Sequence, residues 1–160
     1  METESLAAAL GREHRDIDEG IAAFTAAPGD PRPLARAIRA LRRHIYLEEE
    51  FLFPLLRQAE PALMAPVFVM LREHAQIWAT LAALDREPVP GDELALCRQL
   101  TVQLVHHNPK EERVLYPRAG SALPPGADGR LREFLRSGEL PGGWVCAKAR
   151  PGPDTPGETG

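Results

Sequence analysis

The chain has 160 residues, with 19 lysines and arginines against 23 aspartates and glutamates and a formal net charge of −4. This length suits a single domain whose core holds it together without disulfides or a structural metal. The slightly acidic balance offers no basic surface for nucleic acid or anionic membranes, so we expect neither as a partner. Cys97 and Cys146 lie far apart without a CxxC spacing, which argues against a disulfide framework or a zinc knuckle and favours two reduced thiols.

The first residues, "METESLAAALGREH", are acidic and lack the basic and apolar regions of a secretory signal. No apolar run in the sequence approaches the ~20 residues that a membrane-spanning helix needs. We therefore expect a cytoplasmic protein that does not enter a membrane.

Proline and glycine divide the first 120 residues into four long helical segments. The breaks lie at residues 27–33, 59–63 and 86–93. Between the breaks, apolar residues recur at spacings of three and four, and no segment alternates with period two. This pattern predicts an all-α fold, an antiparallel up-down-up-down four-helix bundle over residues 1–120. Pro54 and Pro117 fall in the second and fourth segments, where we expect each proline to kink or terminate its helix.

Residues 121–160 differ from the rest in composition and form a C-terminal tail rich in proline and glycine. One amphipathic stretch within the tail, "GRLREFLRSG", predicts a single short helix. The last dozen residues are polar and rich in proline and glycine, so we expect them to be disordered.

The four helical segments form two related pairs. Two stretches of the first half match two of the second: "REHRDIDEGIAAF" (12–24) with "REHAQIWATLAAL" (72–84), and "HIYLEEEFLFP" (44–54) with "HHNPKEERVLYP" (106–117). In the second match, Glu48 falls on Glu111. A duplicated helix pair packs with approximate two-fold symmetry, so a site on the symmetry axis takes residues from both halves.

Each helical segment carries one histidine near its middle. These residues are His14, His44, His74 and His107. His14 and His44 lie 16 and 14 residues from a turn near residue 30, and His44 and His74 lie 16 and 14 residues from a turn near residue 60. His74 and His107 lie 15 and 18 residues from a turn near residue 89. At a rise of ~1.5 Å per residue, these distances bring the four imidazoles to one level of an up-down bundle. Glu48 and Glu111 each follow a histidine at i+4 and share its helix face. Four imidazoles and two carboxylates in mid-bundle suit two borderline transition metals.

Other glutamates beside these six residues have simpler interpretations. Glu49 and Glu50 belong to a glutamate run of the kind that usually faces water, and we expect both to be solvated. Glu13 and Glu73 could orient the neighbouring histidines, but the pattern favours exposed helix surface for both.

The fourth segment contains two adjacent histidines and an internal proline. His107 lies four residues before Glu111, whereas His106 lies five residues before it, so the spacing favours His107 as the ligand. Pro109 removes one helix hydrogen bond, so we expect the fourth helix to be distorted at the site. Of the two cysteines, Cys97 occupies an apolar helical position typical of the core, whereas Cys146 lies in a glycine-rich stretch that could expose it.

The order H…HxxxE…H…HxxxE, with the paired phrases "EEEFLFP" and "EERVLYP", resembles the hemerythrin-like (HHE cation-binding) domain over about residues 5–120. The resemblance implies an antiparallel four-helix bundle around a non-haem di-iron centre, with two iron ions joined by an oxo or hydroxo bridge and by carboxylates. It also implies Glu48 and Glu111 as the bridging carboxylates. By position, the implied metal ligands are His14, His44, Glu48, His74, His107 and Glu111.

The chain departs from the oxygen-carrying hemerythrins at one ligand. Those proteins place a second histidine four residues after the third-helix histidine, where this chain has Trp78. The loss of an imidazole opens a coordination position or lets water complete the shell. Asp18, four residues after His14, could compensate as a ligand or as a partner of a ligand, but the pattern favours a surface aspartate. The resemblance then favours a protein that binds or reacts with a small oxidant (dioxygen, peroxide or nitric oxide), including peroxide dismutation and protection against oxidative stress.

Three other functions fit the same ligands. The first is a sensor of iron, oxygen or redox state, or a regulatory metal-binding module, without turnover. The second is a bundle that holds zinc or another metal without redox chemistry, and the third is a purely structural bundle. The sequence leaves open whether the protein is an enzyme, which oligomeric state it adopts and what the tail does.

Overall fold

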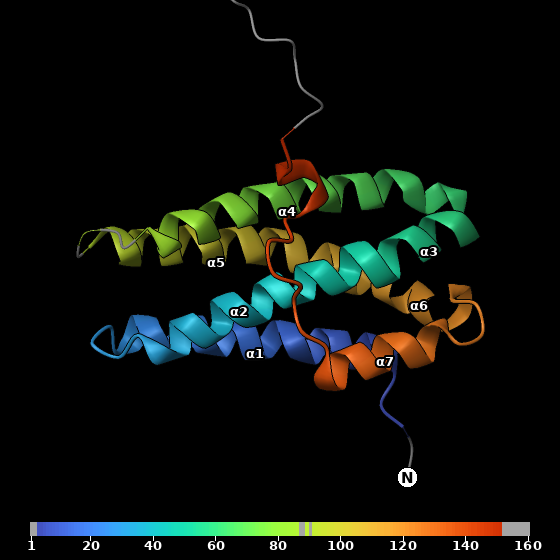
Figure 1. The fold of residues 1–160 in the computed structure, drawn as a ribbon, viewed down its shortest axis with the longest axis horizontal. Helices are drawn as coiled ribbons and strands as arrows, with labels where there is room; N and C mark the ends of the chain where they lie inside the picture. Colours follow the sequence, from blue (N-terminus) through green and yellow to red (C-terminus); the bar gives the residue numbers. More distant parts are fainter. Residues whose placement is uncertain (1–2, 87–88, 90, 152–160) are drawn as a thin grey trace, which may run out of the picture.

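The computed structural model describes residues 3–86, 89 and 91–151, and every regular element within them is a helix, which confirms the predicted all-α class. In Figure 1 the long helices lie side by side as rods. The rods are α1 (Leu6–Ala26); α2 (Arg32–Leu47) continued by η1 (Glu48–Leu52) and α3 (Phe53–Ala59); α4 (Met64–Asp85); and α5 (Asp92–Lys110) continued by η3 (Glu111–Leu115) and α6 (Tyr116–Ala122). The shorter elements are η2 (Pro61–Leu63), α7 (Ala127–Ser137) and η4 (Ala147–Ala149).

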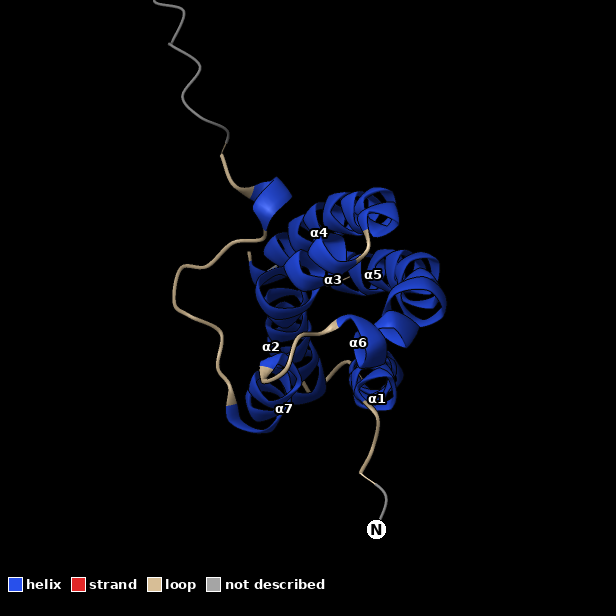
Figure 2. Cartoon of the chain, turned by 90° about the vertical axis from the view of Figure 1, so that its right-hand side faces the viewer, coloured by secondary structure: helices blue, strands red, loops and turns tan. Residues whose placement is uncertain are grey.

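The most extensive helix contacts join α1 to α2 and α4 to α5, the two pairs that the internal repeat predicts. Figure 2 looks along the rods and shows them arranged around a shared interior, with α7 and the segment between α7 and η4 on the outside. Within the described part of the chain, no helix is long and apolar enough to cross a membrane.

Local sequence explains where the rods begin. The hydroxyl of Ser5 accepts a hydrogen bond from the amide of Ala8 (3.1 Å) and so caps the first turn of α1. Gly91 has a φ of 101°, a conformation that glycine adopts without strain, and it turns the chain into α5. The first two predicted breaks between helices are confirmed, whereas the third lies partly outside the described residues.

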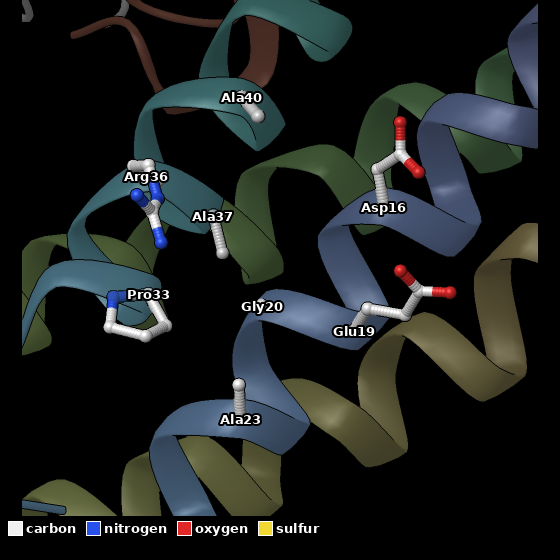
Figure 3. A pocket seen from close by; sticks show the side chains of 8 residues that line it. All are labelled: Asp16, Glu19, Gly20, Ala23, Pro33, Arg36, Ala37 and Ala40. Carbon is white, nitrogen blue, oxygen red and sulfur yellow. The ribbon is translucent and has the colours of Figure 1, made fainter.

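Helices α1 and α2 approach each other closely at Gly20. A Cβ atom at this position would lie 3.0 Å from the Cβ of Ala37 and 3.1 Å from the carbonyl oxygen of Pro33, so a larger residue would push the helices apart. The small side chains leave an open groove between the two helices, with Asp16 and Arg36 among its polar residues (Figure 3). None of the six predicted ligands lines this groove, so we do not assign the functional site to it.

Two π-helical turns carry the predicted bridging glutamates. The amide of Phe53 donates to the carbonyl of Glu48, and the amide of Tyr116 donates to that of Glu111, five residues back instead of four. A proline follows in both cases, and proline has no N–H and collides with the i−4 carbonyl of a regular helix. The wider turn accommodates the proline, so neither rod terminates there, and α3 and α6 continue the rods for 7 residues each.

The distortion predicted at the site in the fourth helix is present, but Pro109 does not account for it. Helix α5 continues through Pro109 to Lys110 before η3 begins. The position that matches Pro109 in the first half is Tyr46, and the π turn η1 forms there without a proline. The prolines that follow the π turns, present in both halves, are the common cause.

The apolar core consists of two clusters separated by a polar layer. On α1, Leu10 belongs to one cluster, Ile17 belongs to the other, and His14 lies between them. His74 on α4 also lies between members of the same two clusters. The predicted level of imidazoles is therefore a polar layer with apolar packing on both sides, which excludes bulk water from it.

The described part of the tail packs along the outside of the rods. Helix α7 confirms the short helix predicted in "GRLREFLRSG", and an extended segment then crosses α2 and ends in η4 beside α4 (Figures 1 and 2). Cys146 of this segment is fully buried in the core, so its glycine-rich surroundings do not expose it. Cys97 is buried as predicted. Of the last dozen residues, which we expect to be disordered, residues 149–151 are described and Ala149 ends η4, whereas residues 152–160 lie outside the described part.

Candidate metal centre

All six predicted ligands lie in the polar layer, and each exposes at most 3% of its surface. They come from all four rods: His14 from α1, His44 from α2, Glu48 from η1, His74 from α4, His107 from α5 and Glu111 from η3. His106, beside His107, is exposed, in agreement with the predicted register. The structure therefore brings together residues that are up to 97 positions apart in the sequence (14 to 111).

The ligand atoms form two groups, and within each group they lie within 4.8 Å of one another. The four-ligand group is Glu48, His74, His107 and Glu111, and the three-ligand group is His14, His44 and Glu111. Oε1 of Glu111 lies 3.2 Å from Nε2 of both His14 and His107. Oε1 of Glu48 lies 3.5 Å from Nε2 of His44 and 3.3 Å from Nε2 of His74. Each of the two carboxylates thus faces one imidazole of each group.

An outer layer of carboxylates fixes the orientation of all four rings. Each imidazole places Nδ1 between 2.6 and 2.9 Å from a glutamate oxygen. The pairs are His14 with Glu112, His44 with Glu13, His74 with Glu49 and His107 with Glu73. An ionised carboxylate can only accept a hydrogen bond, so Nδ1 carries the hydrogen and Nε2 is the atom that faces the interior. This arrangement is the one that metal-binding imidazoles use.

The outer layer contradicts three predictions. Glu49, expected in water, is 8% exposed, and the side chains of Glu13 and Glu73 are only 18% and 13% exposed. The burial of each carboxylate is compensated by a hydrogen bond from an imidazole, which a pattern of polar and apolar residues does not reveal. Glu50 is exposed, as predicted.

Three atoms of the four-ligand group have no hydrogen-bond partner among the described residues. They are Oε1 of Glu48, Nε2 of His74 and Oε2 of Glu111. Nε2 of His74 lies 3.3 Å from the first oxygen and 3.8 Å from the second. A buried polar atom without a partner costs about 1–3 kcal/mol, a cost that a cation bound to all three atoms would remove. Imidazole nitrogen and carboxylate oxygen suit iron and other first-row metals, so these residues fit a metal ion.

The three-ligand group contains a further oxygen from Tyr116, which is absent from the predicted ligand set. Its hydroxyl lies 2.9 Å from Nε2 of both His14 and His44 and 2.9 Å from Oε2 of Glu48. Glu111 Oε1 is 3.3 Å from the same hydroxyl. Burial and the charges of Glu111 and Glu48 raise the pKa of Tyr116 well above 10, so without a metal the phenol keeps its proton.

The internal repeat contained a signal for this tyrosine. It aligns Tyr116 with Phe53, and both residues directly precede a proline. Phe53 stacks on His74, with ring centroids 5.6 Å apart and an interplanar angle of 18°. Tyr116 carries a hydroxyl where its counterpart Phe53 has none. This difference between two matching positions was the signal in the sequence that the halves differ chemically here.

The ligands and their partners hold protons in place of a metal. Burial lowers the pKa of His14, but the hydrogen bond and charge of Glu111 and the charge of Glu48 outweigh it and raise the pKa to about 9. Glutamate neighbours also raise the pKa of His74 and His107 against the effect of burial. Burial and the charge of Glu111 raise the pKa of Glu48, whereas His107 holds the pKa of Glu111 well below its usual range in spite of burial. A metal ion that binds here must displace protons.

Trp78 and Asp18 belong to neither ligand group. The indole of Trp78 packs against Trp144 of the tail, with ring centroids 5.4 Å apart and an interplanar angle of 75°. Asp18 is exposed, and the structure gives no support to the idea that it replaces the missing imidazole.

The helical rods, the six buried candidate ligands and the outer carboxylates define a helical protein with a cluster of histidines and carboxylates that could hold a metal. The family model described as the hemerythrin HHE cation binding domain matches residues 5–119. The chain belongs to this family, which confirms the resemblance found in the sequence. No curated protein and no solved structure matched the chain. The family match ends before α7, so the described part of the tail from α7 onward lies outside it.

Proposed function

We propose that this protein binds two iron ions in a non-haem di-iron centre, and that the centre binds or reacts with a small oxidant such as dioxygen, peroxide or nitric oxide. The four-ligand group and the three-ligand group would each hold one ion, with Glu48 and Glu111 as the carboxylates that reach both. The proposal takes the four rods as the antiparallel up-down-up-down bundle that the family resemblance implies.

The unpaired atoms of the four-ligand group are the observation that carries the proposal. Glu48, His74 and Glu111 each direct toward the same place a buried atom that has no partner among the described residues. Apolar residues of similar volume would serve a purely structural core at least as well, because buried charged groups are costly to desolvate. Cations explain why carboxylates and imidazoles occupy these positions.

The burial of the centre favours small reactants. Each of the six ligands exposes at most 3% of its surface, which suits molecules of two to four atoms. Iron ions joined by carboxylates can change between the ferrous and ferric states, and this redox change is the chemistry that the metals supply. In peroxide dismutation, one peroxide is reduced to two waters while a second is oxidised to dioxygen, so the reaction needs no external reductant.

Tyr116 is proposed as an oxygen donor in the three-ligand group. Its hydroxyl lies 2.9 Å from Nε2 of both His14 and His44, so a metal held by these nitrogens would have the phenol oxygen within reach. A nearby cation favours the phenolate and opposes the effect of the glutamates on its pKa. The matching Phe53 has no donor atom, so the two metal ions would have different ligand sets.

The proposal is tested by loading the full chain with ferrous iron under anaerobic conditions, followed by metal analysis and optical spectra. We expect nearly two iron ions per chain, a spectral change with peroxide, nitric oxide or dioxygen, and release of dioxygen after addition of peroxide. His107→Ala should lower the iron content, whereas His106→Ala alters an exposed neighbour and should leave it unchanged. An unmodified chain that retains no iron, or that shows no spectral change with any oxidant, would refute the proposal.

A sensor or regulatory module without turnover is the second candidate. It is favoured by one contact, because the amide of Ala147 in the tail donates to Glu49 (2.8 Å) and Glu49 accepts a hydrogen bond from His74 (2.6 Å). A change at the metal centre could reach the tail through this pair. Iron binding without release of dioxygen from peroxide, together with altered protection of the tail, would favour the sensor over the catalyst.

A further inference from the structure

We infer that the C-terminal segment 127–150 is a clamp that positions His44 and His74, one imidazole from each ligand group, by holding the carboxylates on their outer nitrogens. The inference rests on the proposed metal centre, and it gives a positioning role to a segment that lies outside the family match. Two separate contacts and one internal comparison support it.

The first contact joins η4 to His74. The backbone amide of Ala147 donates to Oε1 of Glu49 at 2.8 Å, and Oε2 of Glu49 accepts the Nδ1 hydrogen of His74 at 2.6 Å. The side chain of Glu49 is only 3% exposed. Both oxygens of this carboxylate are therefore engaged, one by the tail and the other by the ligand.

The second contact joins the end of α7 to His44. Arg43 donates through Nε to the carbonyl of Gly138 (2.7 Å) and through Nη2 to that of Leu135 (2.8 Å), at the helix end where carbonyls lack partners within the helix. Its Nη1 donates to Glu13 at 2.9 Å, and Glu13 accepts the Nδ1 hydrogen of His44 at 2.7 Å. One guanidinium thus joins the tail to the carboxylate that orients the ligand.

Aromatic packing holds the segment between these two contacts. Trp144 packs against Trp78, and its ring centroid is 5.1 Å from that of Tyr46. The indole N–H of Trp144 donates to Glu50 at 3.0 Å. Cys146, between Trp144 and η4, is fully buried. The segment is therefore anchored along its length, so its contacts at both ends are fixed by packing.

The internal repeat provides a comparison without a clamp. Glu112 matches Glu49 and orients His14 in the same way, but its side chain is 43% exposed. His106 matches Arg43 and approaches the outer glutamate of its own half, Glu73, but its side chain is 72% exposed. The tail thus covers Glu49, whereas the matching Glu112 is open to water. Glu73, which matches Glu13, is itself only 13% exposed and is paired with Lys110 of its own half.

If the tail holds two ligands in their metal-binding orientation, binding of the metal and docking of the tail must favour each other by the same factor. Loss of an outer partner typically weakens metal affinity by about 10- to 100-fold. The clamp should therefore be visible both in the retention of iron and in the protection of the tail.

Ala147 allows this to be tested by removing a single hydrogen-bond donor. It is the first residue of η4, where proline is tolerated, and the preceding Cys146 is extended (φ −60°, ψ 150°), as a residue before proline must be. Ala147→Pro deletes the N–H that binds Glu49, whereas Ala147→Gly keeps it and is the matched control. Both variants are made in the full chain and loaded anaerobically with ferrous iron.

We expect Ala147→Pro to release iron to a chelator about 10- to 100-fold faster than Ala147→Gly, with a changed spectrum or reduction potential of the iron-loaded protein. In the unmodified chain, hydrogen exchange over residues 138–151 should be slower with iron than without it. Equal release and identical spectra for the two variants would overturn the clamp even if their melting temperatures differ, because a merely structural contact changes only stability. This result would leave the proposed function intact.

Failure of the proposed function would be seen separately, as an unmodified chain that retains no iron. The clamp is then measured by nuclear magnetic resonance of the iron-free protein, through the exchange with water of the Nδ1 hydrogen of His74. Faster exchange in Ala147→Pro than in Ala147→Gly supports the clamp, and equal exchange overturns it.

Discussion

The two halves of the chain supply matching candidate ligands, and two of the four histidines are oriented by a glutamate of the other half. Glu49 of the first half holds His74 of the second, and Glu112 of the second half holds His14 of the first. The other two histidines are held by a glutamate of their own half, as in the pair of Glu13 and His44. Each half thus requires the other to complete its outer layer, so neither half builds the centre alone.

Two of the differences between the halves lie directly at the centre. Tyr116 supplies a hydroxyl where the matching Phe53 supplies only a ring. The tail covers Glu49, whose side chain is 3% exposed, but leaves the matching Glu112 43% exposed. The internal repeat accounts for the matching histidines and glutamates, whereas differences between the halves make the two groups unequal. The predictions below test how far the halves are equivalent.

The largest effect is expected from Glu111, the one residue that belongs to both ligand groups. Glu111→Ala should abolish retention of both iron ions, since it removes a ligand from each group. Glu48→Ala removes a ligand of the four-ligand group and, on the three-ligand side, only an oxygen 3.5 Å from Nε2 of His44, so it should leave the three-ligand group closer to normal. Metal analysis after removal of free iron measures the difference, and equal iron contents in the two variants would show that the two carboxylates are equivalent.

The second effect is a pair of opposite pH dependences. As the pH rises, the stability of the iron-free protein should fall and its affinity for iron should rise. The pKa of His14 is about 9 in the folded chain, against about 6.5 when unfolded, so its contribution to stability is complete below pH 6.5 and is lost as the pH rises to 9. At about 1.4 kcal/mol per unit, the free energy of unfolding of the iron-free protein should fall by roughly 3 kcal/mol. Iron affinity should rise over the same interval, because iron must displace the proton.

Denaturant unfolding of the iron-free protein at pH 6.5 and pH 9 measures the first part, and iron titration at the same two values measures the second. His14→Gln is the control for the first part, because it removes the titrating imidazole and should flatten the pH dependence of unfolding. A free energy of unfolding that is equal at both pH values in the unmodified chain would contradict the assigned protonation of the centre.

Tyr116→Phe removes the first difference between the halves. In the iron-free protein, Nε2 of His14 and of His44 both lose the hydroxyl, which should lower the free energy of unfolding by about 1–3 kcal/mol. In the ferric protein, the variant should lose a visible absorption band that arises from the phenolate and iron. Tyr46→Phe is the control, because Tyr46 packs against Trp144 and Phe134 away from the ligands. A band that survives in Tyr116→Phe would exclude the tyrosine as a ligand.

Helical periodicity and the internal repeat were sufficient to predict the six inner residues. Each lies on the buried face of a long helix, where i+4 spacing fixes the relation between a histidine and the next glutamate. Periodicity could not identify Tyr116, which is five residues after Glu111 and would point about 140° away from it on a regular helix. The π turn η3 brings position i+5 back to the same face, so the tyrosine reaches the centre only because the helix is wider there.

The burial of the outer glutamates was not predicted because it depends on contacts with residues distant in the sequence. Glu49 is buried by Ala147, 98 residues later in the sequence, and nothing local to the glutamate run indicates that contact. Glu13 is buried by a guanidinium that also binds the tail. Periodicity assigns helix faces, but the tail covers part of a face that would otherwise be exposed.

The smallest effect is a difference between two equivalent substitutions, Glu49→Gln and Glu112→Gln. Each replaces the carboxylate on the outer nitrogen of one histidine with a neutral amide of the same size. Glu49 also binds the tail and is shielded from water, whereas water can take over part of the role of the exposed Glu112, as for other exposed charge pairs. We therefore expect iron release to be about tenfold faster in Glu49→Gln than in Glu112→Gln. Equal rates would mean that the covered and open sides of the centre hold their ligands equally well, and that only the hydroxyl of Tyr116 distinguishes the two groups.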